Sequence, residues 1–285
     1  MKERPKHRFA NLPEGGENPL NYAVTQRDRS TLAMVTDAIA HKQTLLAYQP
    51  VMRNVADDKV AFYEGLIRVL DPTGRVIPAR EFMPVVEDTQ LGREIDVLAL
   101  RAGLMALADN PDLRLSINMS ARSIGYKGWT TMLSRWLNRD ATIGERLILE
   151  ISEQSAMQVP ELVANFMEQL QSRGICFALD NLGSGYTAIR YFKDLYFDIL
   201  KLDGQFIRGI SRNPDNRALV SVMLSIAENF DMITVAEQVE NEEDSRLLTS
   251  MGVDCQQGFL FSSPTTRPYW TVNTQERKKM TGFLA

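Results

Sequence analysis

Short apolar runs alternate with longer amphipathic stretches along most of the chain. Eight apolar runs bounded by turn residues are typical of buried β-strands; they lie at residues 45–52, 60–70, 113–120, 146–153, 175–182, 198–204, 232–240 and 255–262. From the third run on, stretches with helical spacing of apolar residues separate them, at residues 92–109, 122–138, 160–173, 187–193, 215–230 and 241–251. This alternation of strands and helices predicts an α/β fold, a (β/α) barrel.

The first two strands differ from the others because only a short polar loop, residues 53–59, joins them. A parallel connection needs a crossover of a dozen or more residues, so these two strands should pair antiparallel. We expect the second strand to be the antiparallel one, which gives the barrel an irregular opening. Glu64 on that strand then reaches the end of the barrel that holds the other strand ends only if its register suits.

The pattern also divides the chain into three parts. Residues 1–29 are polar and rich in proline, glycine and charge, so we expect a loosely ordered leader. A helical pattern follows at residues 31–43, and we expect the barrel domain to span residues 30–275. Residues 276–285 form the C-terminal tail.

Composition narrows the classes of function. The chain has 285 residues, 44% hydrophobic and 24% charged, which is ordinary for one large globular α/β domain. Its only histidines, His7 and His41, precede the main pattern, which excludes a Ser-His-Asp triad and a His-rich zinc site. Hydrolytic chemistry would therefore depend on carboxylates. The net charge of −4 argues against a broad nucleic-acid-binding face, so we expect no DNA partner.

The sequence also bears on the protein's location. No run approaches the length of a membrane span, and the N-terminal residues lack the apolar core of a secretory signal. We expect Cys176 and Cys255 to be buried free thiols in a reducing compartment. These features predict a cytoplasmic protein that does not enter the membrane.

Polar residues recur near the carboxyl ends of the predicted strands. They are Glu64, Asn118, Glu150, Asp180, Lys201, Glu237 and Gln257. The carboxyl ends of barrel strands converge on one face, where active sites lie. Any one of these residues alone is consistent with a helix cap or a turn. Caps and turns do not explain well why such residues recur on successive strands.

The chemistry of this series favours a hard cation. Carboxylate and amide oxygens suit Mg²⁺, Mn²⁺ or Ca²⁺, and clustered acids need a cation because like charges disfavour ionisation. Metal pairs held by carboxylates activate water for in-line attack on phosphorus. Lys201 would add a fixed positive charge that orients water or stabilises developing charge on phosphate oxygens.

Seven segments, in order, resemble the motif series of EAL domains, bacterial proteins that hydrolyse or bind cyclic di-GMP. The segments are EGLIR (64–68), SINMS (116–120), LEISE (149–153), DNLGSGYT (180–187), KLDG (201–204), AEQVE (236–240) and QGFLFS (257–262). The resemblance covers roughly residues 45–265. It implies a TIM-like (β/α)8 barrel with one antiparallel strand, cyclic di-GMP as the ligand, one or two Mg²⁺ or Mn²⁺ ions per site, and a homodimer formed near the loop after strand five.

The resemblance also implies a role for each matching residue. The metal ligands it implies are Glu64, Asn118, Glu150, Asp180, which bridges to a second metal, and Asn181 at that second site. The resemblance implies three catalytic residues. Lys201 holds the catalytic water, Glu237 lies near the second metal, and Gln257 lies beside the water network. Its ligand contacts are Gln49, Leu66 and Arg68, and its loop anchors are Glu153 and Glu240, which hold residues 182–188.

Three positions depart from the family pattern. Gly65 replaces the alanine of the name motif and keeps a small side chain, while Gln238 stands where glycine is usual and would crowd the mouth of the barrel. Asn181 follows Asp180 where the family has a second aspartate. An amide oxygen is a poorer ligand for a hard dication than a carboxylate, so the second metal site would be weakened.

Three functions follow from these residues. The first is a metal-dependent phosphodiesterase that opens cyclic di-GMP to linear pGpG, with activity reduced by Asn181. The second is a receptor that binds cyclic di-GMP without cutting it. The third, an interaction scaffold, leaves the clustered acids without a purpose.

Overall fold

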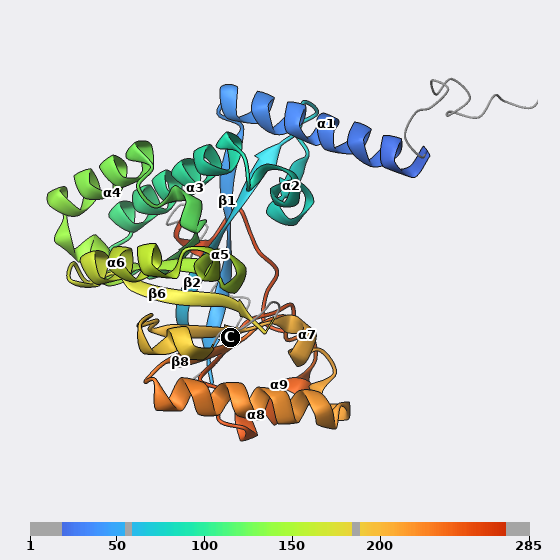
Figure 1. Cartoon of the computed structure of the whole chain (residues 1–285), viewed down its shortest axis with the longest axis vertical. Helices are drawn as coiled ribbons and strands as arrows, with labels where there is room; N and C mark the ends of the chain where they lie inside the picture. Colours follow the sequence, from blue (N-terminus) through green and yellow to red (C-terminus); the bar gives the residue numbers. More distant parts are fainter. Residues whose placement is uncertain (1–18, 55–58, 184–188, 272–285) are drawn as a thin grey trace, which may run out of the picture.

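Eight strands close into a barrel in the structure, a computed structural model that describes residues 19–54, 59–183 and 189–271 (Figure 1). The barrel strands are β1 (Thr44–Arg53), β2 (Val60–Leu70), β4 (Leu115–Asn118), β5 (Leu147–Ser152), β6 (Cys176–Leu182), β7 (Ile199–Leu202), β8 (Ile233–Ala236) and β9 (Cys255–Gln256). They pair in the order β1-β9-β8-β7-β6-β5-β4-β2, and β1 pairs with β2 to close the ring. A further strand, β3 (Val76–Pro78), adds to the outer edge of β2. The predicted TIM-like barrel is confirmed.

The direction of the first strands corrects one expectation. β1 and β2 pair antiparallel, as the short loop between them requires. However, β2 runs parallel to β4, whereas β1 is antiparallel to both β2 and β9. The antiparallel strand is therefore β1 and not β2, because the long segment between β2 and β4 has room for a crossover. Glu64 consequently ends on the same face as the other strand ends.

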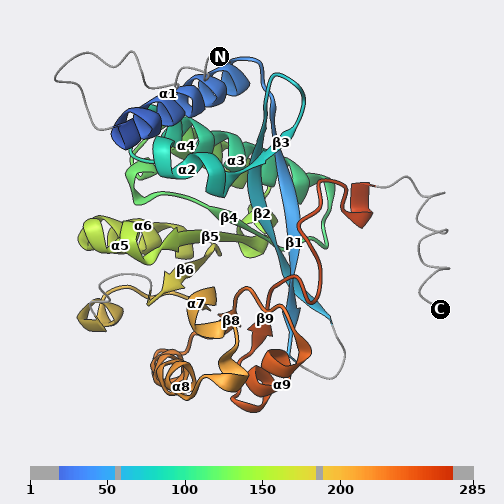
Figure 2. The same cartoon turned by 90° about the vertical axis from the view of Figure 1, so that its right-hand side faces the viewer.

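Helices cover the outside of the barrel (Figures 1 and 2). They are α1 (Pro19–Ala40), α2 (Ala79–Val86), α3 (Gln90–Asp109), α4 (Lys127–Arg139), α5 (Glu153–Gln158), α6 (Pro160–Gln171), α7 (Gly204–Ile207), α8 (Pro214–Asn229) and α9 (Glu242–Ser250), with short 3₁₀ turns at Ala121–Ser123, Ala141–Arg146, Ile189–Lys193, Ile210–Arg212 and Tyr269–Thr271. Among the described residues, no helix is both long enough and apolar enough to cross a bilayer.

Two of the expected helix boundaries need comment. α1 begins at Pro19, inside the segment for which we expected no regular structure, so helix propensity extends further upstream than the apolar pattern indicated. The stretch expected to be helical at 187–193 contains a 3₁₀ turn at Ile189–Lys193, and its first two residues lie outside the described part of the chain.

A small apolar cluster fills one end of the barrel interior. It consists of Val51, Phe62, Ile148, Ala178, Ile199, Val235 and Cys255. Side chains of a strand alternate between faces, so the residue two positions along points into the same interior. In the parallel strands that next interior residue is polar: Ile148 precedes Glu150, and Ile199 precedes Lys201. In the reversed strand β1 the order inverts, and Gln49 comes before Val51. The strand period therefore builds a polar layer on top of an apolar one.

The C-terminal segment covers the outer face of β1 and β2 (Figure 2). The loop between these two strands is too short to supply a helix that would cover this face. Tyr48 and Thr265 exchange backbone hydrogen bonds of 2.8 and 3.0 Å. The Trp270 ring lies edge-on to the rings of Tyr48 and Tyr63, at centroid distances of 5.2 and 4.6 Å. Aromatic contacts thus fix this strap, residues 265–271, to the irregular part of the barrel.

We expect Trp270→Ala to lower the free energy of unfolding by about 2 kcal/mol, because it removes a half-buried indole and its edge-on contacts with the barrel residues Tyr48 and Tyr63. Urea denaturation measures the change. Val222→Ala on α8, where the side chain is 58% exposed, is the control and should change stability by less than about 0.5 kcal/mol. Equal stability of Trp270→Ala and this control would contradict a stabilising strap.

Candidate functional site

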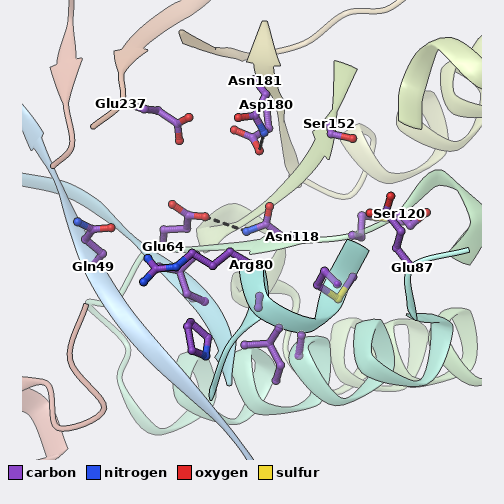
Figure 3. Close-up of a pocket in the computed structure, with 18 of the residues that line it drawn as sticks. Gln49, Glu64, Arg80, Glu87, Asn118, Ser120, Ser152, Asp180, Asn181 and Glu237 are labelled. Atoms are coloured by element: carbon purple, nitrogen blue, oxygen red, sulfur yellow. Dashed lines mark hydrogen bonds between the residues drawn. The ribbon is translucent and has the colours of Figure 1, made fainter. Parts of the chain in front are cut away.

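A cavity of about 640 Å³ opens at the carboxyl ends of the parallel strands (Figure 3). Its walls come from β2, α2, α3, the loop after β4, and the ends of β5, β6, β8 and β9. Predicted site residues that line it are Gln49, Glu64, Leu66, Arg68, Asn118, Asp180, Asn181, Glu237, Glu240 and Gln257. The polar layer of the barrel forms its floor.

Lys201 lies at the centre of this floor, with its side chain only 1% exposed. Its Nζ atom is 2.7 Å from Glu150 Oε2, 2.8 Å from Glu237 Oε1, 3.2 Å from Glu64 Oε2 and 3.5 Å from Asp180 Oδ1. Four carboxylates from four different strands or strand ends therefore converge on one ammonium group.

Three amides complete the floor beside Glu64. Asn118 Nδ2 donates to Glu64 Oε1 at 2.8 Å, and Gln257 Nε2 donates to Glu64 Oε2 at 2.7 Å. Gln257 Nε2 also lies 3.1 Å from Gln49 Oε1, while Gln49 Nε2 donates to the carbonyl of Ser262 at 3.0 Å. These bonds give every oxygen of Glu64 a donor and fix its orientation.

The carboxylates carry more negative charge than the single ammonium balances. Burial, reinforced by the Glu64 charge, raises the pKa of Glu150 to about 8. Burial also raises the pKa of Asp180, and it raises that of Glu237 well above the usual range. For Glu64, burial is outweighed by Lys201 and the amide donors, so its pKa is lowered. The pKa of Lys201 is raised well above its usual value, because the four acids outweigh its burial. Additional positive charge would stabilise this cluster.

The donor atoms fit a hard divalent cation. Glu150 Oε1 and Gln257 Oε1 are buried oxygens without a hydrogen-bond donor, and Asp180 Oδ1 has only the Lys201 ammonium nearby, at 3.5 Å. Oxygen ligands of this kind, together with excess negative charge, are what Mg²⁺ and Mn²⁺ require. Within the described ranges, no three His, Cys, Asp or Glu side chains already stand in metal-binding geometry. The acids are instead gathered around the Lys201 ammonium.

Asp180 and Asn181 occupy a bulge at the end of β6. Leu179 pairs with Leu200 and Leu182 pairs with Leu202, so β6 holds one residue more than β7 over this stretch. Asn181 adopts a left-handed conformation with φ of 57°, which asparagine tolerates better than most residues. The bulge lets two consecutive side chains line the same cavity, and Asn181 Nδ2 donates to Asp180 Oδ2.

The two expected loop anchors differ in their contacts. Glu153, only 1% exposed, accepts a 2.9 Å hydrogen bond from the backbone N–H of Gly183, at the start of the loop that we expected it to hold. Glu240 is exposed and forms an ion pair with Arg208, with 3.4 Å between Nε and Oε1. Residues 184–188 of that loop lie outside the described residues, so the anchoring role of Glu240 stays a prediction.

Gln238 lies at the rim of the cavity. Like Asn181, it has a left-handed backbone conformation, with φ of 57°. Its side chain is exposed and lines the cavity. Its side chain covers Gly204, where an added Cβ atom would lie 2.3 Å from Gln238 Cδ. Gln238 thus occupies space at the mouth beside the start of α7, in agreement with the crowding we expected.

Asp96 and Arg80 are two of the cavity residues that the sequence did not predict. Asp96 is 5% exposed and accepts hydrogen bonds from Ser123 Oγ at 2.6 Å and from the backbone N–H of Ser120 at 2.9 Å. It thereby fixes the turn that follows Asn118. An acid between Ile95 and Ala99 on the apolar face of a helix was the available signal for Asp96. Arg80 offered no such signal.

Comparison with known proteins identifies a family for this arrangement. Residues 32–264 match the family described as EAL domain. Similar curated proteins include the cyclic di-GMP phosphodiesterases PdeB of Shewanella oneidensis, 30% identical over 81% of this chain, and PdeF of Escherichia coli, 30% identical over 80%. The chain spans only 27% and 30% of these two relatives.

Solved structures agree with the fold. The MucR phosphodiesterase of Pseudomonas aeruginosa, in complex with cyclic di-GMP, has a TM-score of 0.72 and 29% identity, and the alignment covers 83% of this chain and 97% of that one. The FimX EAL domain from Pseudomonas aeruginosa, bound to cyclic di-GMP, has a TM-score of 0.74 and 22% identity, covering 83% and 96%. The second likeness bears on the fold alone.

Asp96 generates a prediction about pH. Burial raises its pKa to about 6, despite the hydrogen bonds from Ser123 and Ser120, so the folded protein binds this proton more tightly than the unfolded chain. The stability that the folded protein gains by holding the Asp96 proton is complete below the pKa of aspartate in the unfolded chain, about 4, and is lost as pH rises through about 6. We therefore expect Asp96→Asn to lose less stability than the parent between pH 4.5 and 7.5, measured by urea unfolding.

The matched control is Asp109→Asn, an exposed aspartate at the end of the same helix. It should keep the parent's dependence on pH. An unchanged pH dependence in Asp96→Asn would show that Asp96 does not hold its proton in the folded state.

Proposed function

The chain belongs to the EAL domain family, and we propose that it is a metal-dependent phosphodiesterase that hydrolyses cyclic di-GMP to linear pGpG. The observation that carries this proposal is the convergence of four carboxylates and Lys201 beneath a cavity that also holds Arg68. Two relatives of similar sequence are named as cyclic di-GMP phosphodiesterases, which supports the same substrate.

The residues divide into a cation-binding group and a ligand-binding group. Glu64, Asn118, Glu150 and Asp180 would hold Mg²⁺ or Mn²⁺, one or two ions per site, and Asn181 would contribute to the second. A divalent cation there would activate water and stabilise charge on the phosphate oxygens. Without it, the acids of the floor would repel a phosphodiester.

The remaining residues orient the reactants. Lys201 and Glu237 form a 2.8 Å ion pair at the floor. In the proposed reaction this ammonium and carboxyl group would orient the attacking water. Gln257 holds Glu64 and so maintains the shape of the cluster. Arg68, Leu66 and Gln49 line the wall and would contact the nucleotide, with the planar guanidinium of Arg68 matched to a phosphodiester.

Asn181 is the reason to expect reduced activity. Its amide supplies no negative charge, and its N–H group occupies Asp180 Oδ2. This hydrogen bond therefore competes with a cation for Asp180 Oδ2. The same observation favours the second candidate, a receptor that binds cyclic di-GMP without cutting it.

A scaffold without nucleotide function is the weakest candidate. Burying charged groups costs free energy, and a barrel floor of apolar residues would be at least as stable. Retention of five ionisable groups around one point is better explained by a ligand. The homodimer expected from the family resemblance and the cytoplasmic location stay predictions.

Incubation with cyclic di-GMP and Mg²⁺ or Mn²⁺, followed by chromatography, tests the proposal. Linear pGpG is the expected product. Binding in calorimetry without product at any metal concentration would instead establish the receptor. The absence of both binding and product would overturn both nucleotide functions.

We expect Glu150→Gln to lower kcat by at least about 100-fold and to weaken metal affinity, because an amide replaces an anionic cation ligand. The shape is conserved, and one buried charge is removed, so the variant should fold. Initial rates across a metal titration measure the effect. Turnover equal to that of the parent would remove Glu150 from the metal site.

We expect Asn181→Asp to reach half-maximal activity at about tenfold lower metal concentration, with a smaller gain at saturating metal. The added carboxylate is a hard ligand, but without metal it repels Asp180 and loses the Asn181 hydrogen bond. The metal-free variant should therefore be less stable than the parent in thermal unfolding.

The control for this titration is Asn229→Asp on α8, which adds the same charge at an exposed position away from the cavity. It should leave the metal dependence unchanged. If Asn181→Asp behaves like this control, then Asn181 does not limit binding of the second cation.

A further inference from the structure

One wall of the cavity carries two guanidinium groups, Arg68 and Arg80, which we call the arginine pair. Arg68 lies near the end of β2 and is half-buried, and Arg80 is the second residue of α2 and is exposed. Both line the cavity. The backbone brings them together because Arg68 pairs with Pro78, the residue at which β3 ends and α2 follows. Figure 3 shows Arg80 reaching from α2 into the cavity.

The arginine pair lacks acidic partners, unlike its neighbours. Over the described ranges, neither Arg68 nor Arg80 forms an ion pair, and Arg68 Nη1 donates only to the backbone carbonyl of Ile67, at 2.9 Å. Around the same cavity, Arg122 lies 2.8 Å from Asp88, and Arg208 lies 3.4 Å from Glu240. Neither guanidinium of the arginine pair is thus neutralised by a direct ion pair, although the charge of Glu64 acts on Arg68.

The two guanidiniums also influence each other. Burial lowers the pKa of Arg68, the charge of Glu64 opposes this effect, and the charge of Arg80 adds to the lowering. Two cations that face one cavity repel each other, and an anion between them would remove that repulsion. The arrangement therefore has the character of an anion subsite.

The cavity consequently has two ends of opposite charge. The floor gathers four carboxylates around Lys201 and would accept a phosphodiester together with a divalent cation. The wall with the arginine pair accepts a phosphodiester without metal, because planar guanidiniums bind two phosphate oxygens at once. A cyclic dinucleotide carries two phosphodiesters, one for each end.

We propose that Arg80 joins Arg68 in a subsite for the phosphodiester of cyclic di-GMP that is not being hydrolysed. This inference rests on the proposed function, since it takes the same ligand in the same cavity. Arg80 does not touch the reacting atoms in this arrangement. Its contact is equal in the ground state and the transition state, so its loss raises KM and leaves kcat unchanged.

The test measures cyclic di-GMP affinity by calorimetry in a Glu150→Gln background that slows hydrolysis, at a Mg²⁺ concentration raised until it offsets the weaker metal affinity of this variant. We expect Arg80→Ala to weaken affinity about tenfold, as the loss of a charge-assisted hydrogen bond at an exposed site implies. Arg80→Lys should recover part of this loss, because it keeps the charge but not the planar fork. In the chain with Glu150 intact, Arg80→Ala should raise KM by a similar factor with kcat within twofold.

The matched control is Arg75→Ala, which removes an arginine just before β3 that lies 3.8 Å from Glu81 and does not line the cavity. Its affinity should stay within twofold of the parent. Thermal unfolding without ligand separates binding from a structural role, since Arg80→Ala and Arg75→Ala should then unfold at the same temperature.

Two results would overturn the subsite. One is an affinity of Arg80→Ala equal to that of its parent, and the other is a weakened affinity that coincides with a lower ligand-free unfolding temperature. Both leave the proposed function intact, because the parent still binds. Absence of both cyclic di-GMP binding and turnover in the chain with Glu150 intact would overturn the proposed function and the subsite together.

Discussion

The buried ammonium of Lys201 among four carboxylates is the interaction on which the site depends. Its partners come from β2, β5, β6 and the end of β8, so the cluster exists only when the barrel has closed in one register. Removing the Lys201 ammonium would leave four buried carboxyl groups without their shared partner, which is costly. The cluster therefore links the correct closure of the fold directly to the chemistry of its floor.

The same cluster is incomplete as a set of charges. One ammonium faces four acids, and the raised pKa values of Glu150, Asp180 and Glu237 reflect the imbalance. Protons balance part of this charge, and the divalent cation that we propose would balance it in their place. The bulge at Asp180 and Asn181 lies at the edge of this cluster, where an amide takes the place of a further acid. The local shape of β6 would therefore influence how tightly the cluster binds a metal ion.

The irregular opening of the barrel contributes to the other side of the cavity. Because β1 is reversed, its Gln49 enters the polar layer and connects Gln257 to the carbonyl of Ser262 in the C-terminal segment. Because β2 continues into β3 and α2, Arg68 and Arg80 come to lie on one wall. β2 therefore contributes to both parts of the cavity, with Glu64 in the acidic floor and Arg68 in the basic wall.

The sequence by itself determined the features that depend on local spacing. Apolar runs of strand length and the short loop at residues 53–59 predicted the barrel and an antiparallel pair. Polar residues near the carboxyl ends of the strands predicted a site on one face of the barrel. Motif order added the family. Only the tertiary structure decided which of β1 and β2 is reversed, that β6 bulges at Asn181, that Lys201 contacts four acids, and that Asp96 and Arg80 line the cavity. The physical reason is that side-chain period and loop length act between near neighbours in the chain, whereas strand register, bulges and buried charge contacts are set by residues that meet only when the ring of strands closes.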